Sequence, residues 1–150
     1  MSRVQLALNV ADLEQSIVFY SHLFGVEPHK RRPGYANFAV ANPPLKLVLI
    51  EGHGEAGTLN HLGVEMESTD EVASKIDEAR QFGFDITVQE STTCCFAVQD
   101  KVWINDGEIH WEWYTVLEDA QQDTSLVKLG GKPVITVEGS GNVCGPDGCC

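Results

Sequence analysis

The chain has 150 residues, of which 22 are acidic and 10 are Lys or Arg, giving a formal net charge of −12. This length suits one domain with its own core, and the acidic balance without a basic cluster argues against nucleic acid and anionic membranes as partners. No apolar run reaches the roughly 20 residues that a membrane span needs, and the N-terminus lacks the apolar stretch of a signal peptide. We therefore expect a cytoplasmic protein.

The first part of the chain predicts a strand, a helix and two further strands. Residues 3–10, RVQLALNV, alternate apolar and polar side chains as a strand does. Asp12 is a suitable N-cap for a helix, and Gly25 is suited to end it. The runs YANFAV and LKLVLIE, separated by the turn-forming ANPP, predict the next two strands.

The same order of elements returns in the second part. NHLGVEM predicts a strand, and Ser68 is a suitable cap for a second helix. His61 follows Gln5 by 56 residues, and Ser68 follows Asp12 by 56 residues, which indicates a duplicated unit. Three further strands are predicted in DITVQES, CFAVQDKVWI and EIHWEWYTVL, the last two joined by the hairpin signal NDG.

The C-terminal part differs in composition from the rest. Residues 119–150 are polar and rich in glycine, so we predict a flexible tail. It holds Cys144, Cys149 and Cys150, three of the five cysteines. Because the count is odd and no secretory signal is evident, we interpret the cysteines as free thiols, redox groups or ligands of soft metals.

The other two cysteines, Cys94 and Cys95, are neighbours in TTCCFAVQDKVW. Adjacent residues of a regular strand point to opposite faces, so both thiols can bind one atom only where the backbone forms a loop or bulge. The preceding STT suits such a break. One interpretation is two small buried residues. The other is a pair of thiolates for a thiophilic centre such as trivalent arsenic, cadmium or zinc.

The paired units, opening with LALNVADLEQSIVFYSHLFGVEP and closing with WEWYTV, resemble the vicinal oxygen chelate superfamily of glyoxalases, bleomycin-resistance proteins and extradiol dioxygenases. The resemblance covers about residues 3–117. It implies an α+β fold in residues 1–118, in which two βαβββ modules, about residues 1–56 and 57–118, form a cupped mixed sheet. Modules of this superfamily pair within one chain or between two, so the resemblance also allows a homodimer.

The resemblance further implies a divalent metal inside the cup, held by Gln5, His61 and Glu112. Ring-cleaving relatives have histidine in place of Gln5, and an amide oxygen is a weaker donor than an imidazole. His110 shares a strand face with Glu112 and either supports a ligand from behind or ligates in its place. The remaining histidines, His22, His29 and His53, occur at a helix end or in loops, and we expect them at the surface.

The cysteine pair narrows the resemblance. TCCFAVQDKVW, together with RPGYANFAV, PPLKLVLIEG and the final CC, resembles the branch that contains the cadmium-induced proteins and the carbon–arsenic lyases (ArsI). That branch implies an enzyme of the non-heme iron dioxygenase type, dependent on Fe(II) and O2, which detoxifies trivalent methyl or aromatic arsenicals by cleaving the carbon–arsenic bond to give arsenite. Cys94 and Cys95 would bind the arsenic, with no catalytic residues implied beyond the metal ligands.

Two other functions are considered. A protein that sequesters cadmium or arsenic on its thiols without turnover is compatible with the resemblance to cadmium-induced proteins. A glyoxalase-like isomerase is disfavoured, because such enzymes need a fourth ligand and the corresponding strand, LKLVLIEG, is apolar around Leu47 and Leu49.

Overall fold

The computed structural model describes residues 1–94 and 96–119, which form one eight-stranded sheet and two helices. The sheet begins with β1 (Arg3–Val10), whose alternation was expected from the sequence. The first helix, α1 (Leu13–Phe24), is capped by Asp12, whose side chain accepts a hydrogen bond from the backbone N–H of Gln15. It ends at Gly25, which has a φ of 65° that favours glycine.

The rest of the first module contains one strand that the sequence analysis did not predict. After α1 come β2 (Lys30–Arg32), β3 (Tyr35–Val40) and β4 (Leu45–Glu51), and the last two match the expected runs. β2 has three basic residues and no apolar alternation, so it carries no strand signal of its own. It forms because it pairs antiparallel with β3 along its whole length.

The second module repeats the first. It consists of β5 (Leu59–Glu65), α2 (Thr69–Phe82), β6 (Asp85–Cys94), β7 (Ala97–Asn105) and β8 (His110–Asp119). Ser68 caps α2 through its side chain, as the sequence predicted, and Gly83 ends the helix in the left-handed region. A break occurs at the start of the expected STT run, where the register of β6 shifts between Gln89 and Thr92 and Ser91 has a φ of 46°.

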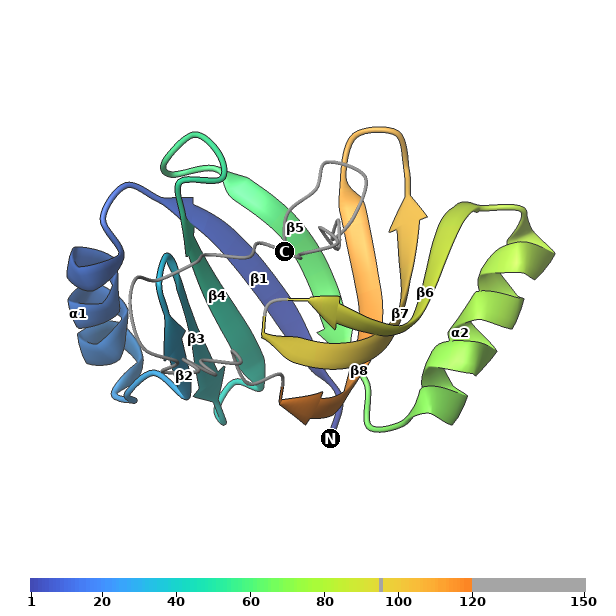
Figure 1. Ribbon diagram of the computed structural model, residues 1–150, viewed down its shortest axis with the longest axis horizontal. Coiled ribbons are helices and arrows are strands. Elements are labelled where there is room, and N and C mark those ends of the chain that lie inside the picture. The colour runs from blue at the N-terminus through green and yellow to red at the C-terminus, as the bar shows by residue number, and fades with distance from the viewer. Residues whose placement is uncertain (95, 120–150) are drawn as a thin grey trace, which may run out of the picture.

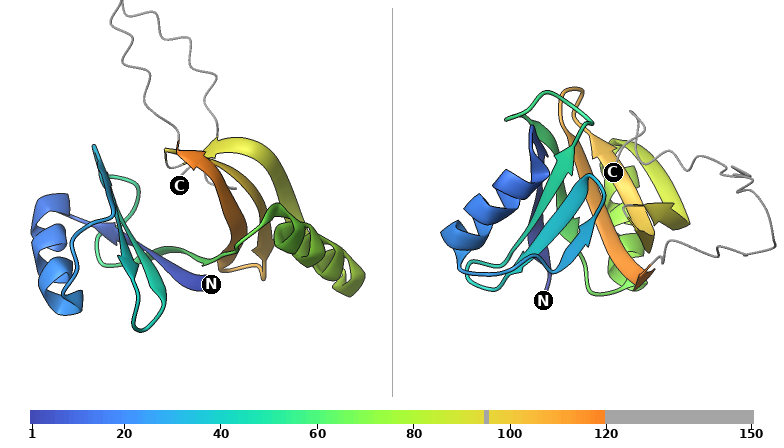
Figure 2. Two further views of the ribbon diagram at one scale, coloured as in Figure 1. Left: turned by 90° about the horizontal axis from the view of Figure 1, so that it is seen from below. Right: turned by 60° about the vertical axis from the view of Figure 1, so that its left-hand side comes forward.

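The strand order of the sheet is β2-β3-β4-β1-β5-β8-β7-β6, so each module supplies one half. The halves join where β1 pairs antiparallel with β5, while β4 and β8 run parallel to β1 and β5, respectively. In Figure 1, α1 and α2 lie at opposite sides of the molecule. Figure 2 shows the two halves curving toward each other with a helix on the outside of each. This is the α+β vicinal oxygen chelate fold that the sequence predicted, with a concave inner face.

Strand alternation separates the outer face of the first module from its inner face. On the outer face, Leu13 and Ile17 of α1 pack against Phe38, Leu47 and Leu49 of the sheet. On the inner face, a second apolar cluster contains Ala7, Tyr35, Val48 and Ile50, with Phe96 of the second module packed against it. Burial of apolar surface stabilises both faces, at about 25 cal/mol per Å² removed from water.

Within residues 1–94 and 96–119, neither helix is long and apolar enough to cross a membrane. The tail predicted for residues 119–150 falls, beyond Asp119, outside the described residues. Its cysteines, Cys144, Cys149 and Cys150, lie there too.

Candidate functional site

The join between the modules brings together the three residues predicted as metal ligands. Gln5 lies on β1 and His61 on β5, its antiparallel neighbour, while Glu112 lies on β8, which runs parallel to β5. Gly63 pairs with both Gln5 and Glu112. A Cβ atom at Gly63 would lie 3.1 Å from the Glu112 carbonyl oxygen and 3.2 Å from Gln5 Nε2, so the missing side chain allows the approach.

The polar ends of these three side chains converge on one point of the inner face. Gln5 Nε2 lies 3.0 Å from His61 Nε2 and donates a 3.1 Å hydrogen bond to Glu112 Oε2. His61 Nε2 and Glu112 Oε2 are 3.4 Å apart. All three residues are buried, with 4 to 5% of their surface exposed, so water is largely excluded from the cluster.

Glu112 is held ionised by a buried lysine. Lys101 Nζ donates a 2.8 Å hydrogen bond to Glu112 Oε1, and no part of the Lys101 surface is exposed. Burial alone would raise the pKa of Glu112, but the positive charge of Lys101 and the hydrogen bond and charge of His61 lower that pKa to about 2. The cluster therefore keeps a carboxylate at neutral pH, with its second oxygen directed at Gln5 and His61.

The orientation of His61 is fixed by a chain of hydrogen bonds on its other side. Thr58 donates to the backbone carbonyl of Glu55, Asn9 donates to Thr58 Oγ1, and Asn60 donates to Asn9 Oδ1. The oxygen of Asn60 therefore faces His61 Nδ1, 2.7 Å away, and accepts its proton. When His61 is neutral, this hydrogen bond keeps the ring proton on Nδ1 and leaves the lone pair of Nε2 directed at the cluster, as ligation of a metal requires.

Gln5 is anchored by Tyr114, whose hydroxyl donates a 2.5 Å hydrogen bond to Gln5 Oε1. Burial, followed by the negative charges of Glu65 and Glu112, raises the pKa of Tyr114, so the hydroxyl stays protonated. The ring of Trp103 closes the site from β7, meeting the His61 ring edge-on at 5.3 Å between centroids.

The donor set fits a small divalent cation. Ligands about 2.1 Å from a metal and at right angles to one another lie about 3.0 Å apart, which is close to the separations of 3.0 to 3.4 Å seen here. An amide ligates through its oxygen, so to hold a metal Gln5 would have to exchange the positions of its amide oxygen and NH2 group. The NH2 group would then donate to the Tyr114 hydroxyl. One imidazole, one carboxylate and one amide oxygen leave the opposite side open, as in non-heme iron(II) sites.

A fourth ligand is missing at the position that the repeat would provide. In the second module Glu112 pairs with Gly63. The repeat offset of 56 residues relates Gly63 to Ala7, and Ala7 pairs with Val48 in the first module. Val48 is thus the counterpart of Glu112 and cannot ligate. Leu47 and Leu49, the apolar residues expected at the position of a fourth ligand, instead point into the outer core beneath α1.

The other predicted residues take separate places. His110 begins β8 and hydrogen-bonds Asn105 across the β7–β8 hairpin. The three remaining histidines are exposed, as expected: His22, His29 and His53. Cys94 is the last residue of β6 and pairs with Ala97. The Cys94 side chain and the whole of Cys95 lie outside the described part of the chain, so the arsenic-binding role stays a prediction.

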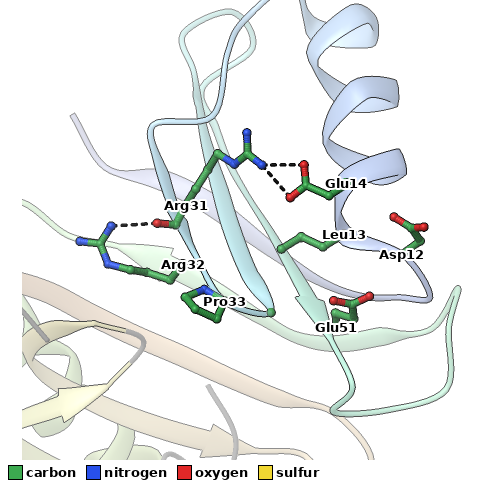
Figure 3. Close-up of a pocket in the computed structure, with 8 residues that line it drawn as sticks. Asp12, Leu13, Glu14, Arg31, Arg32, Pro33 and Glu51 are labelled. Atoms are coloured by element: carbon green, nitrogen blue, oxygen red, sulfur yellow. Dashed lines mark hydrogen bonds and ion pairs between the residues drawn. The ribbon is translucent and has the colours of Figure 1, made fainter. Parts of the chain in front are cut away.

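A separate hollow of about 430 Å³ lies at the start of α1, beside the turn between β2 and β3 (Figure 3). Its most prominent charges are already paired, since Arg31 Nη2 contacts both carboxylate oxygens of Glu14 at 2.6 Å. The Arg32 guanidinium donates to the backbone carbonyl of Arg31. The residues that line this hollow do not include Gln5, His61 or Glu112, so it is distinct from the candidate metal site.

Relatives share most of the chain length. Cadmium-induced protein CadI from Mycobacterium tuberculosis (strain ATCC 25618 / H37Rv) is 53% identical over 145 residues, covering 96% of this chain and 93% of the relative. A trivalent organoarsenical cleaving enzyme from Thermomonospora curvata is 51% identical over 154 residues, covering all of both chains.

Solved structures share the fold at low identity. An extradiol ring-cleaving dioxygenase from B. fuscum has a TM-score of 0.56 at 16% identity, covering 79% of this chain and 34% of the other. Residues 3–111 match the family model described as the Glyoxalase/Bleomycin resistance protein/Dioxygenase superfamily. The chain belongs to this superfamily.

Proposed function

We propose that this protein is a cytoplasmic enzyme that cleaves the carbon–arsenic bond of trivalent organoarsenicals, such as methylarsenite and aromatic arsenites, to release arsenite. Full-length identity of 51% to a trivalent organoarsenical cleaving enzyme supports the substrate class. The observation that carries the proposal is the buried cluster of Gln5, His61 and Glu112, whose polar atoms lie at the separations of metal ligands.

Gln5, His61 and Glu112 would hold iron(II). Bound there, iron would supply the binding and activation of O2, the oxidant of the cleavage. The chain's own groups prepare this site: Lys101 holds Glu112 ionised, and Asn60 fixes the tautomer of His61. Because these groups are buried, the ligands keep their positions without competition from water.

Cys94 and Cys95 would bind the arsenic of the substrate as thiolates. The backbone supports a position in the same half of the sheet as the metal site, because Cys94 pairs with Ala97 on β7, the strand that also carries Lys101 and Trp103. Arsenic held there would place its carbon substituent over the inner face of the second module, within the same sheet as the three ligands.

The experiment loads the reduced protein with iron(II) without air, adds methylarsenite, admits O2 and follows arsenic species by chromatography with elemental detection. Arsenite released over many turnovers, and only when both iron and O2 are present, is the expected result. Intact methylarsenite after full iron loading would contradict the proposal.

A protein that sequesters cadmium or arsenic on its thiols is the second candidate, favoured by 53% identity to a cadmium-induced protein. The double variant Cys94→Ser/Cys95→Ser separates the roles of thiols and metal site. As an enzyme, this variant keeps its iron and loses turnover of arsenicals, while Glu112→Ala retains arsenic binding and loses iron. Stoichiometric arsenic binding by the wild type, without arsenite release, would favour sequestration.

A further inference from the structure

An unpartnered amide oxygen lies on the inner face of the second module. Gln99 is 5% exposed, and its Oε1 has no hydrogen-bond partner among the described residues. A buried carbonyl oxygen without a partner is unfavourable, so most such groups in folded proteins are hydrogen-bonded. The partner that it lacks is an N–H or O–H donor.

Strand alternation directs Gln99 to the same face as the candidate metal site. On β7 the side chains of Ala97, Gln99, Lys101 and Trp103 are buried. Val98 and Asp100, which alternate with the first three, are less buried. Lys101 contacts Glu112, and Trp103 contacts His61, so the side chains of this set point to the inner face. Gln99 follows the same alternation, because the register irregularities at this point belong to its neighbours β6 and β8.

Gln99 lies on β7 between the cysteine end and the metal end of the proposed substrate site. Lys101, which contacts the ligand Glu112, is two residues away from Gln99, about 7 Å along the strand. An equal step in the other direction leads to Ala97, the partner of Cys94. Its cross-strand neighbours are Thr92 on β6 and Val116 on β8. A substrate held on this face between Cys94 and the metal ligands therefore lies beside Gln99.

The chemistry of a trivalent arsenical decides which part of it meets this oxygen. In water the arsenic carries two hydroxyl groups, and both leave when two thiolates bind. The remaining substituent is the organic group, whose bond to arsenic must lie beside the metal site to be cleaved. A donor available to Gln99 then belongs to that organic group.

We propose that Gln99 is a specificity-determining residue whose Oε1 accepts a hydrogen bond from an amino or hydroxyl substituent on the organic group of an aromatic arsenical. This inference rests on the proposed function. A methyl or unsubstituted phenyl group leaves the oxygen unpaired or hydrated, whereas an aminophenyl group satisfies it. We expect a preference of about tenfold for the donor-bearing arsenical, since one buried hydrogen bond is worth a little over 1 kcal/mol.

The test compares phenylarsenite with its 3-amino, 4-amino and 4-nitro derivatives. We measure kcat/KM of the iron-loaded enzyme and, separately, Kd of the metal-free protein from quenching of tryptophan fluorescence. Gln99→Met removes the acceptor at similar length. Gln89→Met is the matched control, because Gln89 already accepts a hydrogen bond from Trp103 Nε1. Comparing each variant with the wild type cancels the electronic effect of the substituent on the reaction.

The expected result is a preference of about tenfold for one amino derivative, in both Kd and kcat/KM, that Gln99→Met abolishes and Gln89→Met retains. Equal Kd values across the series in the wild type, or a preference that survives Gln99→Met, would overturn the inference. Selection of the nitro derivative would also overturn it, because the amide would then be a donor. If no arsenical yields arsenite, the proposed function fails, while the Kd values of the metal-free protein still decide the role of Gln99.

Discussion

Replacing Lys101 with methionine should make the stability of the protein depend on a bound metal. Lys101 is fully buried, and its ammonium lies 2.8 Å from Glu112 Oε1. Methionine keeps most of the volume and removes the charge, so the buried carboxylate loses its compensating cation. Breaking a buried pair in this way destabilises a protein by about 3 to 5 kcal/mol. We expect a loss of this size in the metal-free protein.

A divalent metal should restore much of that loss. It would lie on the other side of the Glu112 carboxylate from Lys101, at about 5 Å, where a divalent ion and a unit positive charge repel each other by about 7 kcal/mol at an effective dielectric constant of 20. In the wild type this repulsion weakens metal binding, and in Lys101→Met it is absent. We therefore expect the variant to bind Mn(II), an air-stable probe, at least tenfold more tightly than the wild type.

The assay is chemical denaturation with EDTA or with Mn(II), together with direct titration of the metal. Lys46→Met is the matched control, because Lys46 is also buried on the inner face but its partner Glu65 keeps a second cation, Arg3, at 2.6 Å. The control should lose much less stability than Lys101→Met. Equal losses in the two variants, or a stabilisation by Mn(II) no larger in Lys101→Met than in the wild type, would refute the electrostatic reasoning.

Three further predictions follow from the same cluster. Gly63→Ala places a Cβ atom 3.1 to 3.3 Å from Gln5 and Glu112, so metal affinity, measured by titration, should fall by about tenfold or more while the fold persists by circular dichroism. The pKa of Glu112 is lowered to about 2 from 4.5, so its contribution to stability is complete above pH 4.5 and is lost as the pH falls toward 2. Urea denaturation should show the stability of the wild type falling by about 3 kcal/mol more than that of Glu112→Gln across this window, and parallel curves would contradict it. Val48→Glu adds a carboxylate at the repeat-related position, which should raise Mn(II) affinity and lower arsenical turnover by occupying an open position; unchanged affinity would place Val48 away from the metal.

Much of the fold could be predicted because its signals are local. The caps Asp12 and Ser68 and the alternating strands each follow from a few neighbouring residues, and the offset of 56 residues revealed the repeat. β2 could not be predicted, since Lys30–Arg32 has no apolar alternation and forms only by pairing with β3. Strands of this kind are specified by tertiary contacts rather than by their own sequence.

The residues that complete the site were harder to find. The repeat related Gln5 to His61, and the resemblance supplied Glu112, but neither pointed to Lys101 or Tyr114. A lysine in a strand is usually solvated, and Lys101 reaches Glu112 because β7 pairs with β8, where Trp103, two residues from Lys101 on the same face, lies opposite Glu112. One signal was available: Lys101 shares the parity of Trp103 in AVQDKVW, which places a charge on a face that is otherwise buried.

The differences between the two modules explain how a nearly symmetric sheet supports an asymmetric site. At the position where the second module carries Glu112, the first carries Val48, which belongs to a buried apolar cluster with Ala7 and Ile50. A metal held by Gln5, His61 and Glu112 would therefore face an apolar wall on its side without protein ligands. Such a wall does not compete for the metal and gives water no hydrogen-bond partners, while it can accommodate a methyl or aryl group. A carboxylate at Val48 would close that side, so in the proposed enzyme the apolar residue at this position would leave the substrate access to the metal.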